Sequence, residues 1–364
     1  MLKKSFLILS FIILSYFCTM LFHSIDESPR FVAISNLLYD RILKVSPEFL
    51  EDSILPIVPN MKINQTTWIN AKQSEMLKNV ITQHKYEYSG SGGSAANTIV
   101  ALSFFGEKVG LVGALADDSL GELYKQSLKS KEIQYRITSP RDHSSGSGNC
   151  TVLVTNKENN ERTMLTNLGV SSDVVLSNQD LAFILKAECL IVEGYFFEDT
   201  TYPVIHNAAE QMKKNKKKVA LNLSADFCVR NYLEKIKHYI ENYVDIIIGN
   251  DSEMKILTGK ESISEMVSYL QSKGLVGAIT CGSKGAYVFN KKQIVFIEKP
   301  DAPNLIDTTG AGDLFFAGLL YGLFNGMSIE ASGRLGARCA GEIIQSWGAQ
   351  PTKLSRFKEL LSQR

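Results

Sequence analysis

The chain has 364 residues, of which 45% are hydrophobic and 21% are charged. Its 39 lysine and arginine residues nearly balance 38 aspartate and glutamate residues, so the formal net charge at pH 7 is +1. A disordered chain would have fewer apolar residues or a larger net charge, and a nucleic-acid-binding domain would be strongly basic. The composition therefore predicts a globular protein with one large or two smaller domains, and excludes a collagen-like or low-complexity chain.

The first segment differs from the rest of the chain. Lys3 and Lys4 precede residues 5–22, which carry no charge and are mostly apolar. This run is at the short end of the length that spans a bilayer, and no small-residue cleavage site follows it. The pattern favours an uncleaved anchor, and the flanking charges would place the remainder of the chain outside the cytoplasm.

From Arg30 onward, short apolar runs alternate with segments that have helical spacing. This alternation predicts a mostly parallel sheet with helices on both faces. The buried strands of that sheet are expected at residues 31–35, 109–112, 189–192, 219–223, 246–249 and 278–280.

Two stretches, residues 38–68 and 137–168, interrupt this pattern. Within the second, residues 151–155 alternate polar and apolar side chains, which is typical of a half-exposed strand. We expect the two stretches to form one small sheet that acts as a lid.

Cysteine and histidine residues are scattered along the chain. The six cysteines include no Cys-x-x-Cys pair, and the five histidines form no ligand motif. The sequence therefore indicates neither a zinc site nor a disulfide framework, and reduced thiols are typical of a cytosolic enzyme.

The strongest motif is Asp-Thr-Thr-Gly-Ala-Gly-Asp at residues 307–313, which precedes a very apolar helical stretch. The small residues Gly310, Ala311 and Gly312 allow backbone N–H groups to approach an anion at a helix N-terminus. Asp313 would face the same place, where a carboxylate can accept a proton from a hydroxyl while the N–H groups stabilise a transferred phosphoryl group. The alternative is a glycine turn followed by an acidic residue that only stabilises the helix.

A second motif, Ser-Gly-Ser-Gly-Gly-Ser-Ala-Ala-Asn, covers residues 89–97. It imitates a dinucleotide-binding fingerprint, but the residues before it make a poor buried strand, so we discount that interpretation. The glycine pair allows a substrate to lie against the backbone, and Asn97 offers a donor and an acceptor to hydroxyl groups. The alternative is a helix-leading loop in which Ser94 caps the helix.

A third motif places Asn250 and Glu253 directly after the predicted strand 246–249. Ligands bind at the carboxyl ends of parallel strands, and a carboxylate there can hold magnesium through water molecules. Helix capping is the alternative for this motif. The chain has no Gly-x-x-x-x-Gly-Lys-Ser/Thr motif, so it is not a P-loop enzyme.

In this order, the three motifs resemble those of the ribokinase-like (PfkB) family of carbohydrate and nucleoside kinases, from about residue 30 to residue 364. The resemblance implies a three-layer α/β/α sandwich with a mostly parallel central sheet and a small β-lid. It also implies ATP and magnesium as cofactors and transfer of the γ-phosphoryl group to a primary alcohol.

Roles for individual residues follow from the resemblance. Asp313 would be the general base, and Gly310, Ala311 and Gly312 would form the anion hole. Asn250 and Glu253 match the magnesium and phosphate motif. The ATP-binding residues of the family are matched by Asn250, Thr280, Gly282 and Gly285. The residues that hold the substrate hydroxyls are matched by Asp40, Gly93, Ser94 and Asn97.

Within the family, the sequence is most similar to the adenosine-kinase-like branch. The similarity lies at residues 148–150, 162–164, 193–196, 221–224 and 244–246. In that branch the arginine that matches Arg162 lies near the phosphates or the substrate, and an aromatic residue, here Phe196 or Phe197, stacks on the base. The alternative for these aromatic residues is a place in the core. The chain departs from the family at Ser35, where a glycine is usual, and at residues 60–64.

The resemblance therefore implies a nucleoside kinase that converts adenosine to AMP. The alternative is a sugar kinase of the ribokinase or fructokinase type. A membrane-anchored protein without turnover is a third possibility, which the intact Asp313 disfavours. We expect a small-molecule substrate, no nucleic-acid partner, and a monomer or a homodimer formed through the lid.

The apolar start conflicts with this chemistry, because an exported kinase would meet little ATP. We favour translation from Met20 and a cytoplasmic enzyme. Retention of residues 5–22, with the active domain facing the cytoplasm, is the alternative, and only then would the protein associate with a membrane.

Overall fold

The computed structural model describes residues 28–63, 65–138, 140, 145–155, 162–351 and 354–362. The expected leader, residues 1–22, and the expected start at Met20 lie outside this part of the chain. Within the described part, no helix has both the length and the apolar character needed to cross a bilayer.

Nine strands of the described chain form the larger sheet, in the order β14-β13-β12-β11-β10-β9-β1-β5-β6. The strands from β6 to β12 are parallel, and β13 and β14 are antiparallel additions at one edge. Their bounds are β1 Phe31–Ile34, β5 Val109–Ala114, β6 Gln134–Thr138, β9 Cys189–Glu193, β10 Lys218–Asn222, β11 Ile246–Asn250, β12 Val276–Thr280, β13 Ala286–Phe289 and β14 Ile294–Ile297. Each of the six apolar runs predicted to be a strand coincides with one of these.

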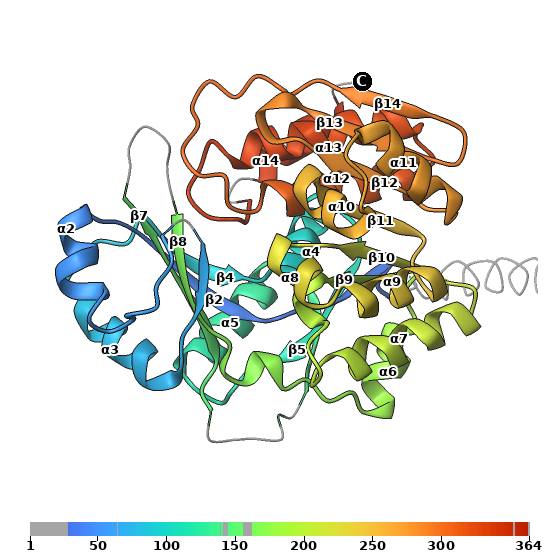
Figure 1. The fold of residues 1–364 in the computed structure, drawn as a ribbon. Helices are drawn as coiled ribbons and strands as arrows, with labels where there is room; N and C mark the ends of the chain where they lie inside the picture. Colours follow the sequence, from blue (N-terminus) through green and yellow to red (C-terminus); the bar gives the residue numbers. More distant parts are fainter. Residues whose placement is uncertain are drawn as a thin grey trace, which may run out of the picture.

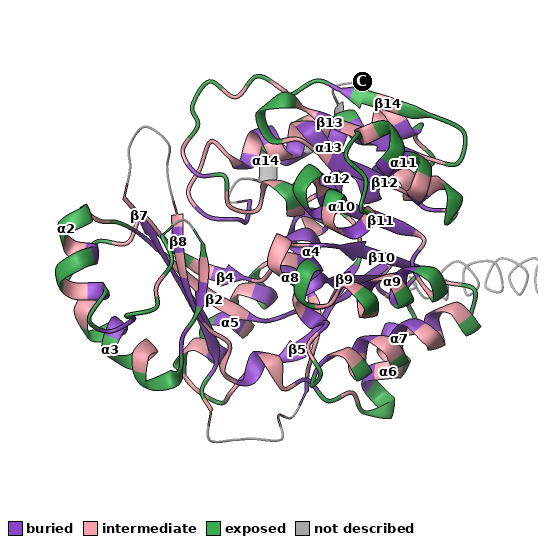
Figure 2. Cartoon of the chain, in the orientation of Figure 1, coloured by how far each residue is buried: buried purple, intermediate pink, exposed green. Residues whose placement is uncertain are grey.

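Helices cover both faces of this sheet (Figure 1). Side chains alternate between the two faces: Phe31 and Ala33 of β1 belong to one core cluster, and Val32 and Ile34 belong to the other. Because both faces are buried, these strands are continuously apolar, and Figure 2 shows them as a buried layer.

The helices divide between these two clusters. The first cluster contains α4 Ser94–Phe104, α5 Ser119–Ser130, α12 Ala311–Phe324, α13 Ile329–Ile343 and α14 Leu354–Ser362. The second contains α6 Asn178–Ile184, α7 Tyr202–Lys214, α8 Asp226–Asn231, α9 Leu233–Asn242, α10 Asp251–Thr258 and α11 Ile263–Ser272. The predicted three-layer α/β/α sandwich is therefore confirmed.

Five strands of the described chain form a second, smaller sheet in the order β3-β8-β7-β2-β4. Their bounds are β2 Leu38–Lys44, β3 Thr66–Trp68, β4 Tyr88–Gly92, β7 Gly148–Val154 and β8 Arg162–Asn167. On the outer side of this sheet lie α2 Pro47–Phe49, the π-helical turn η1 Leu50–Ile54 and α3 Ala71–Ile81 (Figure 1). Short 3-10 turns elsewhere are η2 Gly169–Ser172, η3 Gly194–Phe196 and η4 Gly282–Lys284.

The small sheet differs from the sequence-based expectation in three respects. Strand β4 lies outside the two predicted stretches, and residues 137–138 belong to β6 of the larger sheet. The prediction that residues 151–155 are half exposed is wrong, since all of β7 is buried. Leu153 packs in the cluster under η1 and α3, while Val152 packs on the opposite face with Ile42 and Trp347.

Candidate active site

A cavity of about 470 Å³ lies between the small sheet and the carboxyl ends of the parallel strands. This is the position at which open α/β sheets bind ligands. Twelve residues that were singled out in the sequence line it: Asp40, Gly93, Ser94, Asn97, Arg162, Asn250, Glu253, Thr280, Gly310, Ala311, Gly312 and Asp313. The fold thus brings together residues from both sheets and from the N-termini of α4, α10 and α12.

A second cavity of about 140 Å³ adjoins the first. Gly282 and Gly285 line it, and it shares Thr280, Ala311 and Gly312 with the larger cavity. The rest of its wall is mainly apolar and includes Ala286, Pro300, Phe315, Ala337 and Ala340. The first turn of α12 therefore lies where the two cavities meet.

Glycines shape the start of α12. Gly310 adopts φ +78° as the N-cap residue, and a methyl group on it would lie 2.6 Å from Cβ of Ala349. A methyl group on Gly312 would meet no atom within 4 Å. The first N–H groups of a helix have no acceptor within the helix, so this open end of α12 can bind an anion.

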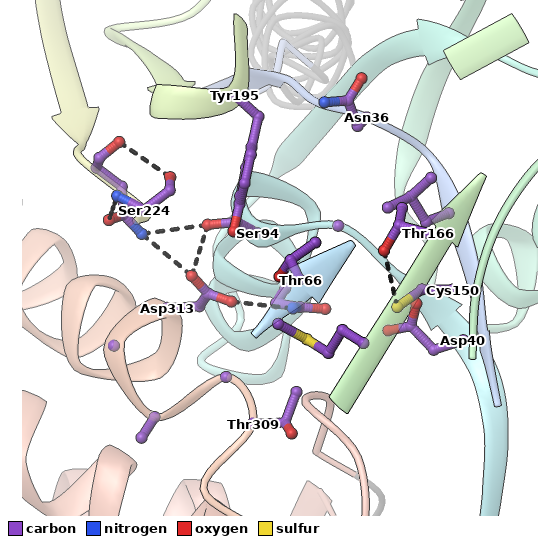
Figure 3. A pocket seen from close by; sticks show the side chains of 18 of the residues that line it. Asn36, Asp40, Thr66, Ser94, Cys150, Thr166, Tyr195, Ser224, Thr309 and Asp313 are labelled. Atoms are coloured by element: carbon purple, nitrogen blue, oxygen red, sulfur yellow. Dashed lines mark hydrogen bonds between the residues drawn. The ribbon is translucent and has the colours of Figure 1, made fainter. Parts of the chain in front are cut away.

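Asp313, in the first turn of α12, has three polar neighbours at the cavity (Figure 3). Its Oδ1 accepts hydrogen bonds from Ser94 Oγ at 2.7 Å and Asn222 Nδ2 at 3.1 Å, and its Oδ2 accepts one from Asn97 Nδ2 at 3.0 Å. Burial raises the pKa of Asp313 to about 6, and these hydrogen bonds oppose the rise. A carboxylate with such a pKa can accept a proton near neutral pH.

The helix α4 follows β4 with one residue between them. Gly93, with φ +107°, is the N-cap residue, and Ser94 is the first helical residue. The sequence alternative in which Ser94 caps this helix is therefore wrong. Its hydroxyl instead donates to Asp313, because the glycine turn directs the first residue of the helix into the cavity.

Asp40 reaches the cavity from β2. A methyl group on Gly92 would lie 2.0 Å from Asp40 Oδ2, so the glycine is required for this close approach. Burial, followed by the charges of Asp307 and Asp313, raises the pKa of Asp40 to about 8.

Arg162 joins β8 of the small sheet to the loop before α12. Its Nη1 donates to Thr309 Oγ1 at 2.5 Å and to Asp307 Oδ1 at 3.3 Å. Asp307 is fully buried and also accepts hydrogen bonds from the backbone N–H groups of Thr309 and Gly348. This network holds a guanidinium group at the cavity beside the open end of α12.

Asn250 and Glu253 form a reciprocal capping box at the start of α10. Asn250 donates to the two Glu253 carboxylate oxygens through its N–H and its Nδ2, at 2.8 Å each, and the Glu253 N–H donates to Asn250 Oδ1. Burial, together with the neighbouring charges of Asp226 and Asp313, raises the pKa of Glu253 to about 7. Capping is therefore a real role of this motif, and both residues also line the cavity.

Phe196, which was expected to contact the substrate, does not line the cavity. It is 0% exposed and packs in the core under the second helical layer, as does Phe197. The neighbouring Tyr195 lines the cavity instead, in edge-to-face contact with Trp68 of β3 at 6.2 Å between ring centroids. Phe227 lies 5.9 Å from each of these two rings.

Asn222 and Trp68 were not singled out for the site in the sequence. Asn222 ends the buried strand β10, and a polar residue at the end of an apolar parallel strand is a signal that could have identified it. Asn36, just after β1, lines the cavity in the same way. Trp68 had no comparable signal, since it lies on a short strand of the small sheet.

The comparisons with known proteins agree with this geometry. The sequence model of the pfkB family carbohydrate kinases matches residues 61–355. The chain belongs to the PfkB family. Its fold is that of a ribokinase-like kinase, and its activity is transfer of a phosphoryl group from ATP to a hydroxyl group.

Relatives within the PfkB family differ in their named substrates. The chain is 28% identical to ribokinase of Haemophilus influenzae, over 74% of this chain and 86% of that protein. It is 27% identical to 5-dehydro-2-deoxygluconokinase of Bacillus licheniformis, with the same coverage. The crystal structure of adenosine kinase from Sinorhizobium meliloti superposes with a TM-score of 0.81 and 27% identity, covering 92% of this chain and 99% of that one.

Proposed function

We propose that this kinase phosphorylates the 5′-hydroxyl group of a nucleoside and converts adenosine to AMP. The observation that carries the proposal is the pair of aromatic rings, Tyr195 and Trp68, in a cavity that is also lined by the polar residues Asp40, Ser94 and Asn97. A flat purine base suits the aromatic side, since bases stack on aromatic rings. The polar side suits the hydroxyl groups of a ribose.

In this proposal, Asp313 accepts the proton of the 5′-hydroxyl as its oxygen attacks the γ-phosphorus of ATP. The new bond from oxygen to phosphorus forms while the bond from the β,γ-bridging oxygen to the γ-phosphorus breaks, and ADP leaves. The N–H groups of residues 310–312 and the guanidinium of Arg162 stabilise the negative charge on the transferred group. ATP extends into the adjoining cavity beside Gly282 and Gly285.

Magnesium is proposed as the metal that accompanies ATP. In the described residues, no three His, Cys, Asp or Glu side chains are grouped so that they can hold a metal directly. Glu253 fits an indirect role, because its oxygens each accept one hydrogen bond from Asn250 and retain lone pairs for metal-bound water. When bound, the metal would neutralise charge on the phosphates.

A sugar kinase is the second candidate function. The observations that favour it are the ribokinase and deoxygluconokinase relatives, which are about as similar to this chain as the adenosine kinase is. Asp40, Ser94 and Asn97 can bind the hydroxyl groups of a free sugar equally well. The two candidates therefore differ in whether Tyr195 and Trp68 contribute to binding.

A substrate panel with the full chain tests the proposal. ADP formation is measured with adenosine, inosine, ribose and fructose at saturating ATP and magnesium. Stacking of one base is worth about 1–3 kcal/mol, so kcat/KM for adenosine should exceed that for ribose by about 5- to 150-fold. Equal or higher kcat/KM with a free sugar would overturn the nucleoside assignment in favour of the sugar kinase.

The variant Trp68→Ala provides a second test. It should remove most of the preference for adenosine over ribose and leave kcat/KM for ribose nearly unchanged. The matched control is Tyr269→Ala, which truncates a half-buried aromatic residue on α11 that does not line the cavity. An unchanged preference in the Trp68 variant would refute the role of the aromatic pair.

A further inference from the structure

A chain of hydrogen bonds leads to Asp313 from Ser91 and Gln350, which do not line the cavity, through Asn97, which does. Ser91 Oγ of β4 donates to Gln350 Oε1 at 3.0 Å, and Gln350 Nε2 donates to Asn97 Oδ1 at 3.2 Å. Asn97 Nδ2 in turn donates to Asp313 Oδ2 at 3.0 Å. Gln350 follows α13 and is far from Asn97 in the sequence, so only the fold brings them together.

The chain has a single direction. Since Ser91 donates its proton to Gln350, its hydroxyl must accept from Ser127 Oγ, which lies 2.8 Å away. Ser127 Oγ accepts from Lys131 Nζ at 2.5 Å. The chain thus begins at an ammonium group, which can only donate, and ends at a carboxylate, which accepts. Every intermediate group accepts on one side and donates on the other.

Because the residues are buried, each amide is restricted to this one orientation. Ser91, Asn97 and Gln350 are 2%, 4% and 3% exposed, so each amide and hydroxyl is largely desolvated and depends on its protein partners, although Ser91 and Gln350 also line a separate cavity of about 630 Å³. Rotating the Gln350 amide by half a turn would place its NH₂ group against the donating hydroxyl of Ser91 and its oxygen against Asn97 Oδ1. Two buried mismatches of this kind are costly, and linked hydrogen bonds strengthen one another.

We propose that Gln350 is a positioning residue for phosphoryl transfer, which fixes the Asn97 amide so that its N–H group, and not its oxygen, faces Asp313. The inference rests on the proposed role of Asp313 as the base. Gln350 acts only through Asn97, since it does not line the cavity. Because Ser91 belongs to the small sheet and Asn97 to α4, Gln350 also makes the setting of Asp313 depend on the position of β4.

The role has a signature in the pH dependence of catalysis. The Asn97 hydrogen bond lowers the pKa of Asp313, against the effect of burial. If Asn97 is no longer held, the pKa of Asp313 rises, and the acid limb of kcat moves to higher pH. The other ionisable groups around Asp313 are contributed by several elements: Asp40 by β2, Arg162 by β8, Glu193 by β9, Tyr195 by η3 and Glu253 by α10. The side-chain hydrogen bonds of Gln350 go instead to Ser91 and Asn97.

The experiment compares Gln350→Met with the full-length wild type and with Gln345→Met. Gln345 lies in the same segment, and its Nε2 donates to the Gly341 carbonyl at 2.9 Å. Gln350→Met should lower kcat by about tenfold, because the Asn97 amide would lose a buried hydrogen-bond partner. KM for ATP should change by less than about twofold, and the acid limb of kcat should move up by about half a pH unit or more. Gln345→Met should change none of these.

A double-variant cycle separates positioning from stability. If Gln350 acts through Asn97, Asn97→Ala combined with Gln350→Met should lose no more activity than Asn97→Ala alone. If Gln350→Met does not fold, Ser91→Ala tests the same chain and should shift the acid limb in the same direction by a smaller amount. An unmoved acid limb in the folded variant, or losses that multiply in the double variant, would overturn the inference.

The variant Asp313→Ala tests the assignment of Asp313 as the base independently of Gln350. Full turnover by Asp313→Ala would refute the base assignment and with it the proposed mechanism. Loss of turnover in Asp313→Ala, together with wild-type behaviour of Gln350→Met, would refute the role of Gln350 alone.

Discussion

At the scale of single residues, several carboxylates at the cavity or next to its lining residues are buried away from water. Burial is the largest cause of the raised pKa values, which are about 6 for Asp313, about 7 for Glu193 and Glu253, and about 8 for Asp40. Glu193 differs in having a structural task. It accepts hydrogen bonds from Ser35 Oγ and from the backbone N–H groups of Asn36 and Ala95, and so ties the end of β1 to the start of α4.

The pKa of Asp313 predicts how activity depends on pH. A base must be deprotonated to act, so kcat/KM, which reports the pKa of the free enzyme, should fall about tenfold per pH unit well below pH 6 and level off about one pH unit above it. Asp313→Asn, which keeps the shape of the side chain, should lower kcat by about 10²- to 10⁴-fold while the dissociation constant of ATP changes little. Steady-state rates from pH 5 to 9 and ATP titration of the variant check both statements. A pH-independent kcat/KM down to pH 5 would contradict them.

Asp40 should lower the stability of the free protein at alkaline pH. Its pKa in the folded state, about 8, exceeds the unfolded value of about 4, so the folded state binds more protons between these two pH values. Its contribution to stability is therefore present at low pH and is lost as the pH rises to 8. Asp40→Asn should raise the melting temperature at pH 8 by about 2 °C and have little effect at pH 4. A variant that melts lower at pH 8 would show that the carboxylate is stabilised as an anion.

The sequence predicted the residues that line the site more completely than the residues that pack around them. Asp313, Asn97 and Glu253 lie in motifs at helix starts, so the sequence predicts both the chemistry and the position of their side chains. The choice between Tyr195 and Phe196 was beyond the sequence, because the turn of η3 decides which of two consecutive aromatic side chains faces the cavity. Gln350 gave no signal at all, since its partners come from β4 and α4.

At the scale of elements, six strands of the larger sheet were predictable because both of their faces are buried and their sequences are continuously apolar, whereas β6, β13 and β14, at or next to the edges, were not predicted. Strand β4 was not predicted either, because its sequence, Tyr-Ser-Gly-Ser-Gly, has little strand propensity. The structure explains that composition: β4 pairs with β2, and its last glycine makes room for Asp40. Tertiary pairing here overrides local preference.

The first turn of α12 predicts opposite effects on stability and activity. Gly312 is a helical residue whose Cβ would meet open space, so Gly312→Ala should keep or raise the melting temperature, since alanine favours helices by about 1 kcal/mol over glycine. The added methyl group would project where the proposed phosphate lies, and kcat/KM for ATP should fall at least about tenfold. Melting curves and ATP-dependent kinetics measure the two effects.

The matched variant is Gly310→Ala. Its positive φ and the 2.6 Å contact with Ala349 Cβ predict a lower melting temperature as well as lower activity. Full activity of Gly312→Ala would refute the anion-binding role of this turn.

At the scale of the whole molecule, the fold class followed from motifs whose order and spacing the sequence displays directly. The path of the segment after α13 could not be predicted from such motifs. Trp347 packs against the small sheet, the Gly348 N–H donates to Asp307, and Ala349 lies against Gly310. This segment, with no regular structure to predict, connects both sheets to the start of α12.

Among the residues that the structure describes, those that line the large cavity fall between Asn36 and Asp313. We therefore expect a chain that begins at Met20 to match the full chain in kcat and in melting temperature. Expression of both forms and comparison of their kinetics test this expectation, and N-terminal peptide mapping of the native protein shows which form is made. A large loss of kcat in the shorter form would show that residues 1–19 contribute to the enzyme.

A single residue connects β4 of the small sheet to α4, whose first turns contribute side chains to the cavity. β4 belongs to the small sheet and α4 to the layer that carries Asn97, and Gly93 alone joins them. A methyl group on Gly93 would lie 2.1 Å from the Asn36 carbonyl oxygen, so no other residue fits there without displacing the end of β1. A rotation of the small sheet relative to α4 would therefore have to change the backbone torsions at Gly93, along with those of the connections from β1 to β2 and from β8 to η2.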